Sequence, residues 1–219
     1  MPHRKKTRTK STDAPMPRRL RRLKQLRMEV AAEAARIIAT EGQHNYHAAK
    51  KKAAERIGIS ERLALPSNIE VKDALRSYQV LYGGAAHEQN IRRLRQTAAR
   101  AMRLLTDFNP RLVGAVLDGT AEEHSRVSLH VFADSVESVV FFFAERGIAH
   151  DQDQRRIRWY SGTHMTVPLV LADLEGQVIE LAVFEEKHLR QPPPSPIDGR
   201  PQQRASLHEV EALLTGASA

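Results

Sequence analysis

Residues 114–132, GAVLDGTAEEHSRVSLHVF, mark the place where the chain changes from one periodicity to another. Before Arg111, apolar residues recur every three or four positions, which is typical of helices. From Arg111 onward, short runs bounded by turn residues favour strands instead. LVGAVLDG and RVSLHVFA are expected to form two strands joined by a short turn. The stretch therefore predicts the beginning of a sheet.

Four helices are expected before this point. The first begins near Pro17 and ends at Gly42, and the second covers YHAAKKKAAERIG. The third begins with a capping box, in which Ser67 caps the helix and Glu70 reaches back to it, and it ends at Gly83-Gly84. The fourth covers EQNIRRLRQTAARAMRLLTDF. These patterns predict an all-helical N-terminal segment.

Further elements are expected after residue 132. SVESVVFFFAERG predicts a helix capped by Asp134 or Ser135. QRRIRWYS, TVPLVLAD and QVIELAVF favour strands, the last two joined by a hairpin at residues 174–176. A proline-rich loop, RQPPPSPIDGRPQQR, leads to a final helix, ASLHEVEALL, with a capping box at Ser206 and Glu209.

These elements predict an α+β protein in which helices precede a mixed sheet that is flanked by further helices. We divide the chain into a basic disordered tail (1–16), a helical segment (17–86), an α/β domain (87–190), and a proline-rich loop with a C-terminal helix (191–219). Residues 1–15 lack the apolar side chains that would stabilise an ordered structure.

The composition excludes several classes of site. The 219 residues include no cysteine, which excludes disulfides, thiolate metal sites and cysteine nucleophiles. No apolar run is long enough for a transmembrane helix, and the basic N-terminus has no apolar region typical of a secretory signal. GxxxxGK[ST], GxGxxG and HExxH motifs are absent. We expect a cytoplasmic protein without a membrane partner.

Positive charge is concentrated near the N-terminus. Residues 1–27 hold 11 Lys and Arg against Asp13, whereas residues 110–219 hold 10 against 16 acidic residues. Such an imbalance is typical of chains that contact polyanions, most often nucleic acid, although it also suits a solvated tail. The candidate contacts are Arg18, Arg19, Arg21, Arg22, Lys24, Lys50, Lys51, Lys52, Arg92, Arg93, Arg100 and Arg103. The last four lie on one face of the fourth helix, a pattern that favours a solvated surface slightly over phosphate contacts.

The opening stretch also resembles the nucleotidyltransferase fold of the polymerase-beta-like superfamily, especially its minimal one-domain members. Their signature is a Gly-Ser pair, a second glycine four residues later, and then a Ser-Asp-x-Asp strand. The resemblance covers about residues 88–190, and Glu180 matches the family's third carboxylate. It implies a nucleotidyltransferase-like domain of bacterial type. The positions that match the signature, and imply a phosphate or nucleotide site, are Gly114, Ala115, Gly119, Ser125, Arg126 and Ser128.

This chain departs from that signature where the family binds metal. Arg126 and Ser128 replace the two acids that hold Mg²⁺, which prefers oxygen ligands. Two interpretations keep a function for the site. Arg126 can bind phosphate without a metal, because guanidinium matches phosphate geometry. Alternatively, Asp118, Glu122 and Glu123 supply a relocated acid cluster.

Three hypotheses follow from the sequence. The leading one is a non-catalytic protein with a degenerate site that binds nucleic acid, with RNA favoured. The second is an active nucleotidyltransferase that uses Mg²⁺ and an NTP, with Glu180 as a catalytic residue. The third is an interaction scaffold, or a toxin–antitoxin-like partner of another protein. None of them fixes the oligomeric state.

Overall fold

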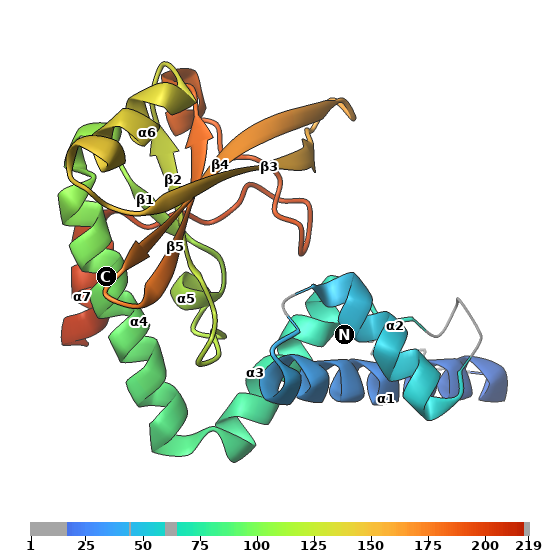
Figure 1. The fold of residues 1–219 in the computed structure, drawn as a ribbon. Helices are drawn as coiled ribbons and strands as arrows, with labels where there is room; N and C mark the ends of the chain where they lie inside the picture. The colour runs from blue at the N-terminus through green and yellow to red at the C-terminus, as the bar shows by residue number, and fades with distance from the viewer. Residues whose placement is uncertain (1–16, 44, 60–64, 217–219) are drawn as a thin grey trace, which may run out of the picture.

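A computed structural model describes residues 17–43, 45–59 and 65–216. The described residues form seven α-helices and one five-stranded sheet, with a helical segment ahead of the sheet (Figure 1). This confirms the predicted α+β class. The predicted basic tail, residues 1–16, lies outside the described residues. No described helix is long and apolar enough to cross a membrane.

The N-terminal segment contains three helices, α1 (Arg18–Glu41), α2 (Tyr46–Ile57) and α3 (Asn68–Tyr82). Gly42 and Gly58 end α1 and α2 in the left-handed conformation, which glycine adopts without strain. Both hydrogen bonds of the predicted capping box begin α3. The three helices share a small core of their own, so the predicted helices are confirmed. The buried residues of that core include Val30, Ile37, Ala49, Ala53, Val71 and Leu75.

Helix α4 (Gly84–Leu104) begins four residues earlier than the sequence predicted. Gly83 and Gly84 were expected to end α3, and they do interrupt it, but the chain enters α4 at once. Gly84 has φ +50°, and a Cβ at Gly83 would lie 2.6 Å from the carbonyl oxygen of Gln79. Two glycines therefore allow the sharp bend between α3 and α4 that Figure 1 shows.

The sheet has the strand order β1-β2-β5-β4-β3. Strands β2 and β5 are parallel, and the other neighbours are antiparallel. The hairpin between β4 and β5 is confirmed, with Glu175 and Gly176 both at positive φ. The strands are β1 (Arg111–Val113), β2 (Val127–Phe132), β3 (His150–Arg158), β4 (His164–Leu174) and β5 (Gln177–Phe184).

One predicted strand is wrong. LVGAVLDG was expected to be extended, but β1 ends at Val113 and residues Gly114–Asp118 form the short helix α5. Gly114, at φ +72°, turns the chain out of the strand. A short apolar run cannot distinguish a strand from a buried helical turn by its periodicity, and this run contains one of each.

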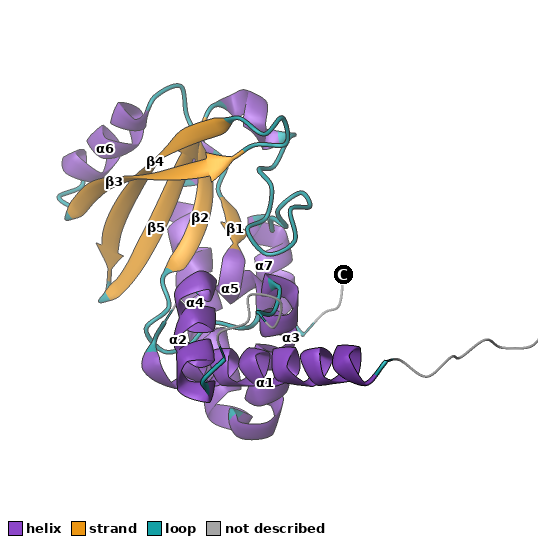
Figure 2. Cartoon of the chain, turned by 90° about the vertical axis from the view of Figure 1, so that its right-hand side faces the viewer, coloured by secondary structure: helices purple, strands orange, loops and turns teal. Residues whose placement is uncertain are grey.

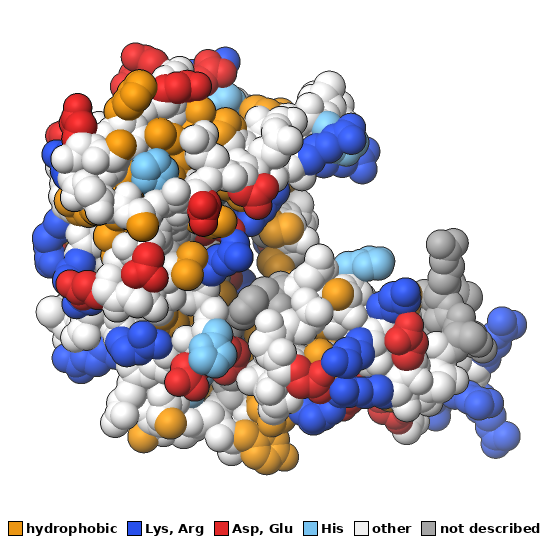
Figure 3. Space-filling view, in the orientation of Figure 1, with side chains coloured by type: hydrophobic (Ala, Val, Ile, Leu, Met, Phe, Trp, Pro, Cys, Tyr) orange, Lys and Arg blue, Asp and Glu red, His pale blue; other side chains and the backbone are white. Residues whose placement is uncertain are grey.

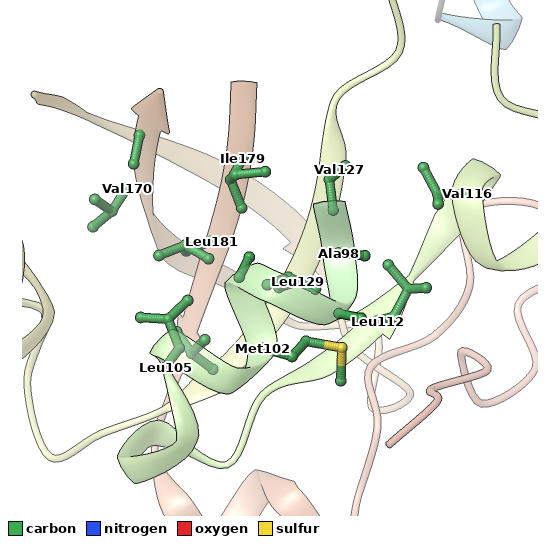
Figure 4. Close-up of a cluster of buried hydrophobic side chains, with 14 of the residues drawn as sticks. Ala98, Met102, Leu105, Leu112, Val116, Val127, Leu129, Val170, Ile179 and Leu181 are labelled. Carbon is green, nitrogen blue, oxygen red and sulfur yellow. The ribbon is translucent and has the colours of Figure 1, made fainter. Parts of the chain in front are cut away.

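Helices cover one face of the sheet. Side chains of α4, α6 (Val136–Glu145) and α7 (Leu207–Thr215) bury the inward residues of β2 and β5. Figure 4 shows the contribution of α4, whose Ala98, Met102 and Leu105 lie beside side chains of the two strands. The capping box of α7 is confirmed. Ser135 occupies the N-cap position of α6, as predicted, but its side chain makes no capping hydrogen bond. Two short 3₁₀ helices, Thr106–Phe108 and Glu186–Leu189, lie in the connections.

The helical segment contacts the sheet domain through residues 118–122, between β1 and β2, and through the proline-rich loop, where the Asn68 amide donates to the Pro196 carbonyl oxygen at 2.8 Å. Lys72 Nζ lies 2.7 Å from an Asp118 carboxylate oxygen, and the Gln79 amide donates to a Glu122 oxygen at 2.6 Å. The His87 ring lies 3.0 Å from the Gly119 carbonyl oxygen. A hollow remains between the two parts in the space-filling view (Figure 3).

Candidate functional site

The sheet face that α4, α6 and α7 leave uncovered forms the floor of a cavity of about 810 Å³. Strand alternation decides which side chains reach this face, because every second residue of a strand points the same way. On β2 these are Ser128, His130 and Phe132, and their partners on β5 are Glu180, Ala182 and Phe184. The proline-rich loop, through residues 193–202, forms the opposite wall.

Glu180 is the centre of the polar part of the cavity. It is 5% exposed, and two arginines bind its carboxylate. Arg155 Nη2 lies 2.8 and 2.9 Å from the two carboxylate oxygens, and Arg126 Nη1 lies 3.4 Å from one of them. The two guanidinium groups outnumber the carboxylate, so this cluster carries a net positive charge at the position where the nucleotidyltransferase resemblance implies metal ions.

His130 lines the same cavity and forms a second polar pair with Arg204, from the loop that precedes α7. Arg204 Nε donates to His130 Nδ1 at 3.0 Å, so that nitrogen carries a lone pair and the ring is neutral. Burial, helped by the charges of Arg204 and Arg155, lowers the pKa of His130 to about 3. Arg204 also donates to the His188 carbonyl oxygen at 2.7 Å, and burial lowers its own pKa to about 10.

Aromatic side chains border the same cavity. Trp159 and Tyr160 follow β3 and contact each other edge to face, with ring centroids 5.6 Å apart. The Tyr160 hydroxyl donates to the Pro192 carbonyl oxygen at 3.0 Å, which ties the end of β3 to the proline-rich loop. Tyr160 remains 45% exposed and Trp159 is half-buried, so both rings present area to a ligand.

The structure brings part of the predicted phosphate site together. Gly114, Ser128 and Glu180 line the cavity, and Arg126 reaches it through Glu180. The other predicted positions shape the backbone instead. Ser125 is buried, and its hydroxyl accepts from the Glu122 amide. The carbonyl oxygen of Ala115 accepts from the amides of Gly119 and Thr120 at the end of α5.

The acids proposed for a relocated metal site do not converge. Asp118 binds Lys72 and Glu122 binds Gln79, so both contact the helical segment, while Glu123 is exposed. Among the described residues, no group of three or more Asp, Glu or His is placed to hold a metal ion. The donor set around Glu180 does not suit Mg²⁺ either, since its neighbours are two cations and a serine.

Most of the predicted nucleic-acid contacts on α2 and α4 bind partners within the chain. Lys50 binds the Asn68 side chain at 2.7 Å and the Pro66 carbonyl oxygen, and burial lowers its pKa. On α2, Lys52 pairs with Glu41 at 2.6 Å and Lys51 lies 3.9 Å from Glu55. On α4, Arg100 pairs with Glu175, Arg103 pairs with Glu211, Arg93 donates to Asn90, and Arg92 is exposed.

The predicted contacts at the start of α1 are different. Burial in α1 begins at Val30, and the preceding half of the helix projects beyond the other helices (Figure 2). Its first turn contains no acidic residue. No ion pair to any of these five cations occurs within the part of the chain that the structure describes. All five are exposed: Arg18, Arg19, Arg21, Arg22 and Lys24.

No family model, curated protein or solved structure matches this chain. The function therefore has to be argued from the site itself.

Sequence reasoning missed most of the residues that line the cavity, among them Arg155, His130 and Trp159, and it missed Arg204, which binds His130. The alternation of β3 offers a signal for Arg155. Arg155 and Ile157 are two residues apart, so their side chains lie on the same face of the strand, and Ile157 packs against the apolar cluster on the cavity face. No comparable signal existed for Arg204, which binds His130 from an irregular loop 74 residues further along the chain.

Proposed function

We propose that this chain is a non-catalytic, nucleotidyltransferase-like protein of the cytoplasm that binds single-stranded RNA. The observation that carries the proposal is the exposed half of α1, where five cations have no carboxylate partner among the described residues. Such a surface gains free energy by releasing the counterions of a polyanion. Paired cations gain less, because binding must first break their internal contacts.

The cavity supports a role in binding one nucleotide of that RNA. Trp159 and Tyr160 offer ring faces for stacking, which is how proteins commonly hold unpaired bases. The Arg126–Glu180–Arg155 cluster has an excess positive charge for a phosphate. Glu180, held by two arginines and without neighbouring acids, lacks the metal ligands that the transfer reaction requires.

The first experiment measures RNA binding as a function of salt. A labelled single-stranded RNA is titrated with the full chain, with a variant lacking three α1 charges (Arg18, Arg21 and Arg22→Gln), and with a matched control lacking three internally paired charges (Lys51, Arg100 and Arg103→Gln). We expect the α1 variant to reduce the slope of log K against log salt by about 2, since each phosphate contact on a single strand contributes roughly 0.7. Equal slopes in the two variants would contradict the proposal.

A second experiment tests the cavity with the chain's single tryptophan. RNA binding is expected to quench Trp159 fluorescence in the natural chain and in Arg103→Gln, but more weakly in Arg155→Gln. Each variant removes one arginine that pairs with a carboxylate, and of the two only Arg155 lines the cavity. Identical curves would exclude the cavity from binding. Incorporation of nucleotide from an NTP with Mg²⁺ would refute the non-catalytic part of the proposal.

A further inference from the structure

Strand β3 is an open edge of the sheet. It pairs with β4 along all nine residues, and no strand lies on its other side among the described residues. Seven of its nine residues are exposed, so both faces of this strand are in contact with solvent. The strand order places it at the edge of the sheet opposite β1. A long strand with one row of unpaired backbone groups is a template for another strand.

The hairpin that joins β3 to β4 shows which backbone groups of β3 point away from β4. The Trp159 amide donates to the Thr163 carbonyl oxygen at 2.8 Å, so residue 159 faces β4 with its backbone groups. In an antiparallel pair this orientation alternates along the strand. The odd-numbered residues of β3 therefore bond to β4, and the amides and carbonyls of Gln152, Gln154 and Arg156 point outward. Of these, the Gln154 amide donates to the exposed Asp153 carboxylate at 2.7 Å, and the row bonds to no other strand among the described residues.

We propose that two copies of this chain associate through their β3 edges, with the strands antiparallel and Gln154 opposite its own copy on the two-fold axis. A two-fold dimer is the simplest closed assembly, and here its axis is perpendicular to the sheet. That symmetry keeps the same sheet face of both copies on one side. The cavities of the two copies then open toward the same side of a ten-stranded sheet.

Charge selects this register. Centring the pair on Gln154 places Asp153 opposite Arg155, in both symmetry-related positions, and Gln152 opposite Arg156. A register centred on residue 153 places two aspartates opposite each other, and a register centred on residue 155 or 156 places two arginines opposite each other. Centring on residue 152 places Asp151 opposite Asp153, and centring on residue 157 places Arg156 opposite Arg158. Like charges directly opposite each other destabilise a strand pair, and opposite charges stabilise it.

This register also gives hydrogen-bond partners to the outward backbone groups of β3. Gln154 opposite Gln154 is a hydrogen-bonded pair, because its amide and carbonyl point outward. The bond to the second copy replaces the hydrogen bond between the Gln154 amide and the Asp153 carboxylate, which frees that carboxylate. Asp153 and Arg155 then form a pair without backbone hydrogen bonds, where side chains of opposite strands lie closest. Arg155 thus contacts Glu180 within its own copy and Asp153 of the second copy, so dimerisation adds a carboxylate beside the Glu180 cluster.

The test is the mass of the full chain in solution, measured by sedimentation over a range of concentrations. Asp153→Arg opposes arginines at both contacts and is expected to weaken dimerisation by about tenfold or more. Asp151→Arg is the matched control: it makes the same charge change on the same face, but it lies opposite Ile157. The chosen register predicts a small effect for this control.

A charge exchange makes the test specific. Arg155→Asp alone is expected to be monomeric, and an equal mixture of Asp153→Arg and Arg155→Asp chains is expected to form a mixed dimer, because each contact again joins opposite charges. Gln154→Pro removes an outward amide without touching the pairing with β4, and it should also dissociate the dimer. A natural chain that stays monomeric would overturn the proposal, as would a dimer that survives Asp153→Arg and Gln154→Pro. Dissociation by Asp151→Arg alone would overturn the register.

Discussion

Acid is expected to destabilise this protein through His130, and the size of the effect follows from the structure. The ring is 5% exposed and accepts a hydrogen bond from Arg204, a donor that does not give up its proton. Protonating Nδ1 would remove that hydrogen bond and bury a second cation beside the first. Burial and the two nearby arginines accordingly lower the pKa of His130 from 6.5 to about 3.

A lowered histidine pKa stabilises the folded chain above the unfolded value and loses that stabilisation as the pH falls. Above pH 6.5 both states are neutral at this ring. Between pH 6.5 and 3 the unfolded chain takes up a proton that the folded chain does not, so the free energy of unfolding decreases by about 1.4 kcal/mol for each pH unit. From pH 7 to pH 5 the loss attributable to His130 is about 2 kcal/mol.

The assay is urea unfolding of the natural chain and of His130→Gln at pH 7 and pH 5. Glutamine keeps an acceptor for Arg204 but has no proton to gain, so the natural chain should lose about 2 kcal/mol more than the variant between the two pH values. His188, whose pKa burial also lowers, is present in both chains and cancels. Parallel losses in the two chains would refute the argument that His130 is held neutral.

Three further predictions test other parts of the structure. Lys72→Met leaves Asp118 without its partner, and we expect a loss of about 1–3 kcal/mol in stability together with faster amide exchange at the contact between the helical segment and the sheet domain. Ser206→Ala removes the cap of α7 and should cost about 1 kcal/mol in chemical unfolding. Arg126→Asp places a second carboxylate beside Glu180, so millimolar Mg²⁺ should raise the melting temperature of this variant but not of the natural chain.

The sequence predicted the helices well because their signals are local. The capping boxes at Ser67 and Ser206 and the terminal glycines at positions 42 and 58 act within a few residues of the helix ends they define. Where two local signals competed, the prediction was wrong. The run after Arg111 satisfies a strand pattern, yet Gly114 turns it into a helix. Gly83-Gly84 ends one helix, as predicted, but also begins the next.

By itself, the sequence determined the α+β order of elements, the basic start of α1, and the arginine and serine at positions 126 and 128. Only the tertiary structure decided which charges are paired. Arg126, Arg155 and Glu180 are separated by 25 to 54 residues and meet because strand register aligns them. Lys50 is partly buried and bound to Asn68, while Arg18 is exposed on the half of α1 that precedes its buried residues. Residue type fixes a side chain's charge, but the free energy of that charge depends on its solvent exposure and on the groups that packing places beside it.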